Sequence, residues 1–476
     1  MITFILSFVA LVLGYIFYGR FVEKVFGVNE NRPTPAYANQ DGVDFVPIST
    51  NRNSLIQLLN IAGLGPIFGP ILGALWGPLA FVWIVLGGIF AGAVHDYFSG
   101  MLSVRNNGAQ LPELVGKYLG NGMKQFVNVF SLILLILVGV VFVTGPAGLI
   151  ATLTPDWITL GMVSAFIFFY YILATLLPID KIIGKIYPIF GAFLIIMALG
   201  VGGGLIVKGY AIPELTFANL HPKGLPVWPL LFITIACGAI SGFHATQSPL
   251  VARTIQNEKY GRKIFYGMMI AESAIAMVWA AAGMAVFHGT DGLQDALVQY
   301  GGPAGVVRHI AITMLGAVGG TLAIIGVIVL PITSGDTAFR GARILIADFF
   351  KMSQRKISSR LIITIPMFVV GYLLTLIDFN FLWRYFSWAN QTTAMIMLWA
   401  AAMFLVQEGK NHWIASVPAT FMTAVSFTYI LQAPEGFSLP TSISYPVGLA
   451  ITVGIAVLFA VKALKVKKRA TIAIEN

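Results

Sequence analysis

Cysteine and charged residues are both scarce in this sequence of 476 residues. A single cysteine, Cys237, is present, so an intrachain disulfide and a multi-cysteine metal site are both excluded. Only 10% of the residues are charged, whereas 58% are hydrophobic and the mean hydropathy is +0.85. A chain with so little charge could not stay soluble as packed globular domains. The composition therefore predicts an all-α polytopic membrane protein.

Apolar stretches long enough to cross a membrane recur along the whole chain. About twenty apolar residues are needed to cross roughly 30 Å of hydrocarbon. We expect about 13 transmembrane helices, at residues 2–19, 54–76, 79–103, 124–151, 158–179, 186–207, 227–250, 262–288, 308–333, 360–378, 381–406, 412–432 and 442–465. The first of them lacks the basic start and the small-residue cleavage site of a signal peptide, so we expect it to remain in the membrane.

The net charge of +10 is explained by membrane topology. With these helices, 25 of the 29 Lys and Arg residues fall on one side of the membrane. Positive charge gathers on the cytoplasmic side of membrane proteins. We therefore expect a multi-pass protein of the cytoplasmic membrane, with its N-terminus outside, its C-terminus in the cytoplasm, the lipid bilayer as its surroundings and no nucleic-acid partner.

The second expected helix contains an interruption, in the stretch NIAGLGPIFGPILGALWGP at residues 60–78. Glycine recurs at every fourth residue from Gly65 to Gly77, which lets neighbouring helices approach closely along one face. That spacing does not explain the sequence Gly-Leu-Gly-Pro at 63–66, because proline removes a backbone hydrogen bond and clashes with the preceding turn. A broken helix persists in lipid only where it is buried in protein or lines a watery cavity.

A second interruption, CGAISGFHATQSP at residues 237–249, lies in the seventh expected helix. The two interrupted helices are five apart, and because five is odd, two five-helix units would enter the membrane from opposite sides. Paired interruptions in inverted repeats indicate the binding site of a secondary transporter. We expect an accessory helix and loop, a first repeat, an extracellular connection, a second repeat, and two accessory helices with a basic tail, at 1–53, 54–207, 208–226, 227–406 and 407–476.

Four segments resemble motifs of the carbon starvation protein A (CstA) family. They are AGLGPIFGP, GAVHDYFSGMLSVRNNGAQLPELV, FITIACGAISGFHATQSP and TSGDTAFRGAR. The resemblance implies a leucine-transporter-like fold with a five-plus-five inverted-repeat core, and uptake of peptides or pyruvate. No Ser-His-Asp set, HExxH sequence or cysteine cluster supports a membrane enzyme, so we expect neither enzymatic activity nor a cofactor.

The ends of broken helices suit small ions and charged solutes. Exposed N–H groups at a helix start favour a carboxylate, and free carbonyls at a helix end favour a cation. We expect a substrate site formed by residues of both interruptions, namely Asn60, Gly63, Gly65, Ser241, Gly242, His244 and Gln247. His244 could equally be a neutral histidine bonded to a carbonyl. Asn390 and Gln391 could line the same path or form hydrogen bonds between helices.

Ionisable residues lie far from the ends of two expected helices. Placing a charge in a bilayer costs at least about 2.5 kcal/mol, so such residues are usually functional. We expect His95, Asp96 and Glu272 to take part in proton coupling. The alternatives are an ion pair between Asp96 and a basic residue near the cytoplasmic side, and a structural hydrogen bond for Glu272.

Sodium is the other candidate for the coupling ion. In the leucine-transporter-like fold that the resemblance implies, the eighth core helix supplies paired hydroxyls to Na⁺. Thr333 and Ser334, with Asp336 nearby, occupy that helix here and offer the oxygen ligands that a hard cation prefers. The alternative is a helix end at Gly335 without an ion. After it, we expect an amphipathic helix on the cytoplasmic surface at 338–356.

These features together predict a cation-coupled importer that works by alternating access. Its partner would be a small solute with a carboxylate, and the choice among peptide, pyruvate and amino acid stays open, as does the choice between H⁺ and Na⁺. A channel or passive pore is the alternative, although channels more often use rings of ligands from several subunits.

Overall fold

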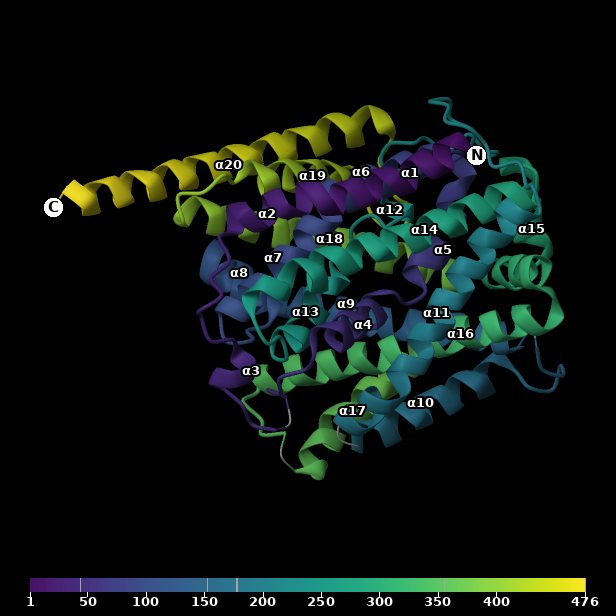
Figure 1. Ribbon diagram of the computed structural model, residues 1–476, viewed down its shortest axis with the longest axis horizontal. Helices are drawn as coiled ribbons and strands as arrows, with labels where there is room; N and C mark the ends of the chain where they lie inside the picture. The colour runs from purple at the N-terminus through teal and green to yellow at the C-terminus, as the bar shows by residue number, and fades with distance from the viewer. Residues whose placement is uncertain (43, 152, 177–178, 355, 476) are drawn as a thin grey trace.

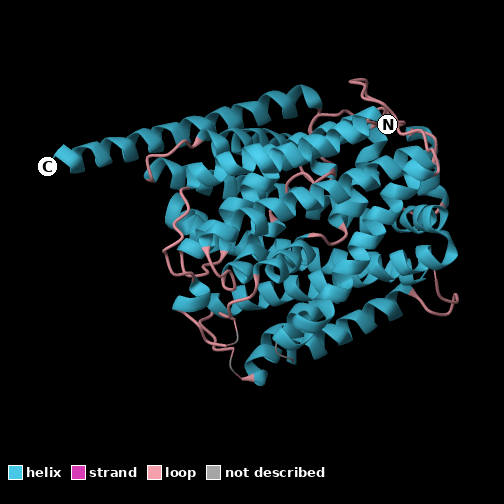
Figure 2. Ribbon diagram, in the orientation of Figure 1, coloured by secondary structure: helices cyan, strands magenta, loops and turns pink. Residues whose placement is uncertain are grey.

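The computed structural model describes residues 1–42, 44–151, 153–176, 179–354 and 356–475, and for 175–176, 179–190 and 468–475 it describes the backbone only. Every regular element in these ranges is helical (Figure 2). The described ranges contain nine helical stretches that are long and apolar enough to cross a membrane, or ten if one bent pair counts as a single span. The expected all-helical membrane architecture is therefore confirmed.

Figure 1 labels the α-helices along the chain. The first half of the chain contains α1 (Ile2–Leu13), α2 (Gly19–Phe26), α3 (Pro35–Ala38), α4 (Thr50–Ile61), α5 (Gly65–Gly73), α6 (Leu79–Gly87), α7 (Ala93–Arg105), α8 (Leu111–Leu119), α9 (Asn121–Ala151), α10 (Leu160–Leu176) and α11 (Ile179–Val207). The second half contains α12 (Leu230–Thr234), α13 (Phe243–Ala252), α14 (Gly267–Val286), α15 (Thr290–Gln299), α16 (Pro303–Phe349), α17 (Ile357–Leu374), α18 (Phe379–Gln407), α19 (Trp413–Gln432) and α20 (Thr441–Glu475).

Five short elements of other helical types lie in the described parts of the chain. They are the π-helical turns η1 (Gly14–Tyr18), η3 (Gly88–Gly92) and η5 (Arg262–Tyr266) and the 3₁₀ turns η2 (Ala74–Trp76) and η4 (Glu258–Tyr260). A π-helical turn leaves a backbone carbonyl without its usual partner, and such turns often occur at functional sites. In η3, the Ile89 carbonyl accepts a hydrogen bond of 2.9 Å from the Tyr266 hydroxyl in η5.

All of the expected membrane segments coincide with helices, but fewer of them qualify as full spans. The described parts of α10 and α11 are shorter apolar helices, Leu160–Ala174 and Gly191–Val207. The seventh expected helix is divided into α12 and α13, because residues 235–242 between them are not helical. Among the described residues, nine or ten stretches therefore qualify as spans by length, where the sequence predicted 13.

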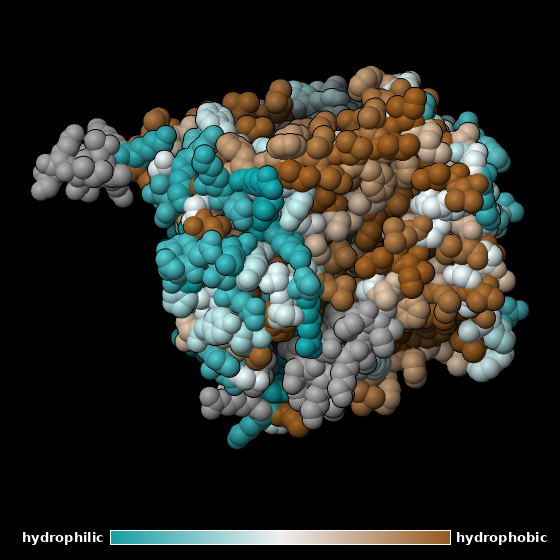
Figure 3. Space-filling model, viewed as in Figure 1, coloured by the Kyte–Doolittle hydropathy of each residue, from teal (hydrophilic) through white to brown (hydrophobic). Residues whose placement is uncertain are grey.

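The surface is divided into hydrophobic and hydrophilic zones. In Figure 3, a broad hydrophobic area lies between hydrophilic residues on the left, around α3 and α8, and others along the right edge. The helices run roughly between these two edges in Figure 1. This arrangement is typical of a protein whose apolar middle faces lipid tails and whose two ends face water.

One expectation about α16 is wrong. The sequence predicted a membrane helix at 308–333 and a separate surface helix at 338–356, but α16 begins at Pro303 and ends only at Phe349. Its backbone is non-helical at Gly316, with φ of 71°, and helical again beyond it. Arg340 and Arg343 are buried, and Arg340 donates a 3.2 Å hydrogen bond to Asp336. Two of the charged residues that suggested a surface helix are therefore packed inside the protein, whereas Lys351 and Lys356, beyond the end of α16, are exposed.

Candidate functional site

The two predicted helix interruptions exist, and they touch each other. The chain bends by 50° between α4 and α5, which are separated by residues 62–64. A Cβ atom added to Gly65, at the start of α5, would lie 2.2 Å from Cys237 Cβ in the second interruption. One turn later, a Cβ on Gly69 would lie 3.1 Å from the Thr234 carbonyl. The spaced glycines therefore let the two broken helices meet at their breaks.

Four ionisable side chains form a continuous buried network beside the second break. His95 and Asp96 come from α7, His244 from α13 and Glu272 from α14, and all four are fully buried. Asp96 Oδ1 lies 2.8 Å from His95 Nδ1, and Asp96 Oδ2 lies 2.8 Å from His244 Nδ1. On its other side, His244 Nε2 lies 3.4 Å from Glu272 Oε2. His244 thus stands between two carboxylates.

Glycines in η3 allow the helices that carry this network to come close together. A Cβ on Gly88 would lie 2.4 Å from Ser273 Oγ in α14. A Cβ on Gly92, one residue before α7, would lie 2.2 Å from the Ala239 carbonyl in the second break. The sequence Gly-Ile-Phe-Ala-Gly therefore acts as a contact surface that brings α7 against both α14 and the break.

The structure joins residues that the sequence analysis assigned to two separate sites. The sequence predicted His95, Asp96 and Glu272 as one functional group and His244 as part of another, whereas the structure brings all four together. The alternative partner for Asp96, a basic residue near the cytoplasmic side, is replaced by two histidines. His244 is bonded to a carboxylate and not to the carbonyl that the alternative required. Sequence spacing could not show this, because the residues come from three separate helices.

Asn390 of α18 stabilises the second break by contacting four of its residues. Its Oδ1 accepts a 2.6 Å hydrogen bond from the Phe243 amide at the start of α13, and its carbonyl accepts one of 3.1 Å from the Gly242 amide. Its Nδ2 donates to Ser241 Oγ at 3.1 Å and contacts Cys237 Sγ at 3.6 Å. Asn390 therefore forms hydrogen bonds between helical segments, which was one of the two interpretations of this residue from the sequence. The amides at the start of α13 are occupied by Asn390 in this conformation.

The first break differs, because buried polar atoms around it lack partners. Gln57 and Asn60 lie on one face of α4 and are buried, but Asn60 Oδ1 and both polar atoms of the Gln57 side chain make no hydrogen bond with the described residues. Gln247 Oε1 on α13 is in the same state. Gly63 packs against the Phe142 ring. Unsatisfied buried polar groups are uncommon in proteins and call for water or a ligand.

Only one member of the expected sodium set contacts the first broken helix. Ser334 Oγ donates a 3.1 Å hydrogen bond to the Leu59 carbonyl near the end of α4. Thr333 Oγ1 donates within its own helix, to Leu330. Asp336 is paired with Arg340, and the helix does not end at Gly335. The carbonyl end of α4 and the Ser334 hydroxyl are therefore adjacent, whereas Asp336 already has a cationic partner.

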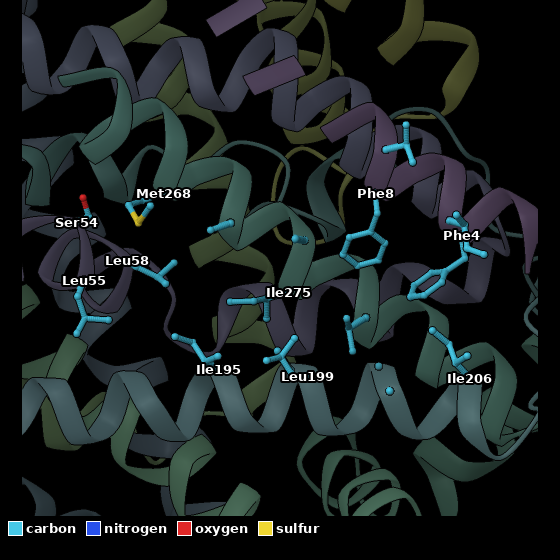
Figure 4. A pocket seen from close by; sticks show the side chains of 18 of the residues that line it. Phe4, Phe8, Ser54, Leu55, Leu58, Ile195, Leu199, Ile206, Met268 and Ile275 are labelled. Carbon is cyan, nitrogen blue, oxygen red and sulfur yellow. The ribbon is translucent and has the colours of Figure 1, made fainter. Parts of the chain in front are cut away.

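A large cavity is lined by residues outside this network. It has a volume of about 810 Å³ and is lined by α1, α4, α11 and α14 (Figure 4). Its walls are apolar side chains such as Phe4, Leu58, Leu199 and Ile275, and Ser54 is one of its few polar residues. None of the four ionisable residues lines it. A carboxylate would be poorly accommodated there, so we place the candidate substrate site at the breaks instead.

Comparison with known proteins agrees with this architecture. The family model described as carbon starvation protein CstA matches residues 1–162, 147–290 and 298–429. An uncharacterized membrane protein of Haemophilus influenzae is 49% identical over 349 residues, which cover 62% of this chain and 94% of that protein. The peptide transporter CstA of Escherichia coli is 25% identical over 551 residues, covering 87% of this chain and 78% of the relative.

A third relative has a different named substrate. The pyruvate/proton symporter BtsT of Escherichia coli is 28% identical over 338 residues, which cover 56% of this chain but only 46% of the relative. Among solved structures, a manganese transporter of Eremococcus coleocola superposes with a TM-score of 0.52 at 14% identity, over 88% of this chain and 94% of that one. At such low identity the likeness concerns the fold alone. By the extent of the family match, this chain belongs to the CstA family of carbon starvation proteins and is a membrane transporter, not an enzyme.

Proposed function

We propose that this protein is a secondary transporter that imports a small solute with a carboxylate, namely a peptide, pyruvate or an amino acid. Import would be coupled to H⁺ or Na⁺ and would proceed by alternating access. The observation that carries the proposal is the meeting of two broken helices, at Gly65 and Cys237, beside a buried network of ionisable groups. Broken helices that meet in a bundle are a common form of transporter binding site.

The substrate site in this proposal lies at the first break. Asn60, Gln57 and Gln247 supply hydrogen-bonding atoms that have no partner among the described residues. The Ser241 hydroxyl and the Gly242 and Phe243 amides would serve the substrate carboxylate only after Asn390 moves away, because all three now bond to Asn390. A change of partner of this kind is what alternation between two conformations requires.

The coupling ion has two candidate sites. For H⁺, the carriers would be His95, Asp96 and Glu272, connected through His244. For Na⁺, the ligands would be Ser334 and the carbonyl end of α4, which are already in contact. The relative named as a pyruvate/proton symporter favours H⁺.

The proposed topology follows the charge distribution of the sequence. It places the protein in the cytoplasmic membrane with its N-terminus outside and its C-terminus in the cytoplasm. Residues 54–207 and 227–406 would form the two five-helix repeats of a leucine-transporter-like core.

Uptake into proteoliposomes tests the proposal. Labelled pyruvate and a labelled dipeptide would be supplied separately under an imposed proton gradient or sodium gradient. We expect uphill accumulation driven by one gradient, and loss of that accumulation in Asp96→Asn if the ion is H⁺. Asp291→Asn, which changes an exposed carboxylate in α15, is the matched control and should transport normally.

Two other results would contradict the proposal or its proton-coupling part. If both solutes only equilibrate under either gradient, the protein is a passive pore and the importer proposal fails. If accumulation follows the sodium gradient and survives in Asp96→Asn, the buried network is structural and Ser334 becomes the residue to change.

A further inference from the structure

Three different ligand types face one another beside the second break. They are the thiol of Cys237, the imidazole of His244 and the carboxylate of Glu272, all buried. Their ligand atoms all lie within 4.8 Å of one another. Sulfur and imidazole nitrogen select zinc-like ions, whereas calcium and magnesium prefer oxygen alone. The single cysteine rules out a multi-cysteine site but leaves a mixed site of this kind possible.

The spacing is close to that of a tetrahedral ion. Bonds of about 2.0 Å to nitrogen and oxygen hold those two atoms about 3.3 Å apart, and a sulfur at about 2.3 Å lies about 3.5 Å from the nitrogen. His244 Nε2 and Glu272 Oε2 are already 3.4 Å apart. Small side-chain movements would therefore bring all three ligands to one ion.

Two of the three ligand groups make no hydrogen bond through their ligand atoms within the described chain, whereas Cys237 Sγ donates to Ser241 Oγ at 3.5 Å. His244 Nε2 and both carboxylate oxygens of Glu272 are buried and make no hydrogen bond there. A buried carboxylate without hydrogen bonds is costly unless a cation or a proton compensates it. A divalent ion facing one carboxylate and one thiolate would be neutralised by them.

The neighbouring residues orient the ligands as they do in metal proteins. A histidine that binds a metal through one nitrogen usually donates its other N–H to a carboxylate or a carbonyl. His244 Nδ1 lies 2.8 Å from Asp96 Oδ2, so its Nε2 is directed to Glu272 and Cys237. Asp96 is itself held by His95 at 2.8 Å, and Asn390 Nδ2 contacts Cys237 Sγ at 3.6 Å.

We propose that Cys237, His244 and Glu272 bind a zinc-like divalent cation, with one coordination position open. Binding would release the thiol proton to solvent, because a thiolate is the form that binds metal. The bound ion would join the second break to α14 and hold the two together, so it would inhibit transport. The inference rests on the proposed function in one respect, which is that the ion enters when the breaks open to admit a substrate.

Cobalt(II) absorption of the purified full-length protein in detergent is the test, because it does not depend on transport. A thiolate bound to Co²⁺ gives a near-ultraviolet charge-transfer band, and the chain has only one cysteine, so the band reports this site alone. We expect the band to appear with Co²⁺, to disappear when Zn²⁺ is added, and to be absent from Cys237→Ser. His244→Gln and Glu272→Gln should each weaken Co²⁺ binding at least as much as Asp96→Asn, for which we expect a loss of about 10- to 100-fold.

Controls separate this site from surface binding. His288→Asn removes an exposed histidine that follows α14 and should leave the band unchanged. All variants must elute as monodisperse protein before they are compared. Absence of the band in such wild-type protein would overturn the proposal, as would a band of unchanged affinity in both His244→Gln and Glu272→Gln. A normal band in a protein preparation that fails to accumulate solute even without added metal would instead contradict the transport proposal alone.

Discussion

The two helix breaks are similar in position but opposite in their hydrogen bonding. At the second break, Ser241, Gly242 and Phe243 all bond to Asn390. At the first break, Gln57 and Asn60 leave polar atoms without a partner in the described chain. A satisfied break forms a rigid frame, whereas an unsatisfied one keeps hydrogen-bonding capacity for a ligand. In this conformation, therefore, the second break is held by Asn390, whereas the first break offers unpartnered polar atoms to a ligand.

The largest expected effect comes from separating the two breaks. In Gly65→Ala, the new Cβ would lie 2.2 Å from Cys237 Cβ and 2.3 Å from its Sγ, so one of the broken helices must move. We expect a loss of about 3 kcal/mol of stability, typical of severe overpacking, and loss of uptake. Thermal unfolding in detergent and uptake by proteoliposomes would measure both.

Two further variants show whether the contact itself is responsible. Gly203→Ala in α11 places its Cβ in open space and should behave like wild type. Removing the opposing side chain in Gly65→Ala/Cys237→Gly should recover part of the lost stability. If the double variant is no better than Gly65→Ala, the contact between the breaks is not what limits stability.

An intermediate effect is expected when the frame of the second break is removed. Asn390→Ala leaves the Phe243 amide and the Ser241 hydroxyl without their partner. Each buried group left unsatisfied costs about 1–3 kcal/mol, so a loss of about 2 kcal/mol is expected in thermal unfolding. Asn128→Ala, at a half-buried position in α9, is the control. Equal stability of the two variants would mean that Asn390 does not support the break.

The smallest effect on stability, with a distinct effect on transport, is expected at the first break. Gln57→Leu removes polar atoms that have no partner, so the thermal midpoint should stay the same or rise. Uptake should fall, because the substrate loses a hydrogen-bonding group. Gln432→Leu, which removes another unpartnered side-chain oxygen at the end of α19, should leave uptake unchanged. Normal uptake by Gln57→Leu would contradict recognition at the first break.

Much of the fold could be predicted from local sequence, because hydrophobic length and the Gly-Pro combination act within a single helix. The breaks at Gly63 and Gly242 were found in this way. The continuation of α16 to Phe349 was not predicted. Charged residues such as Arg340 and Arg343 are typical of a helix face in contact with water, and their burial is known only from the packing. The spacing of Asp336 and Arg340, four residues apart, was the available sign of their ion pair.

The candidate site was predictable as a set of residues but not as an arrangement. Asp96, His244 and Glu272 were each recognisable as polar groups within apolar helices. Their connection depends on α7, α13 and α14 packing together, which no local pattern encodes. Asn390 was noticed only as an amide in a core helix, and Cys237 only as a lone cysteine. Both become informative once their contacts at the second break are known.

Because α16 is long, a small tilt of this helix would displace its end by a larger distance. From Ser334, which touches the end of α4, the helix continues for about 22 Å to Phe349 at 1.5 Å per residue. A tilt of about 10° around Ser334 would displace that end by about 4 Å, since a helix moves as a nearly rigid rod. A small change at the first break would therefore move the far end of α16 by about the size of a side chain. The packing around the break itself need not be disturbed.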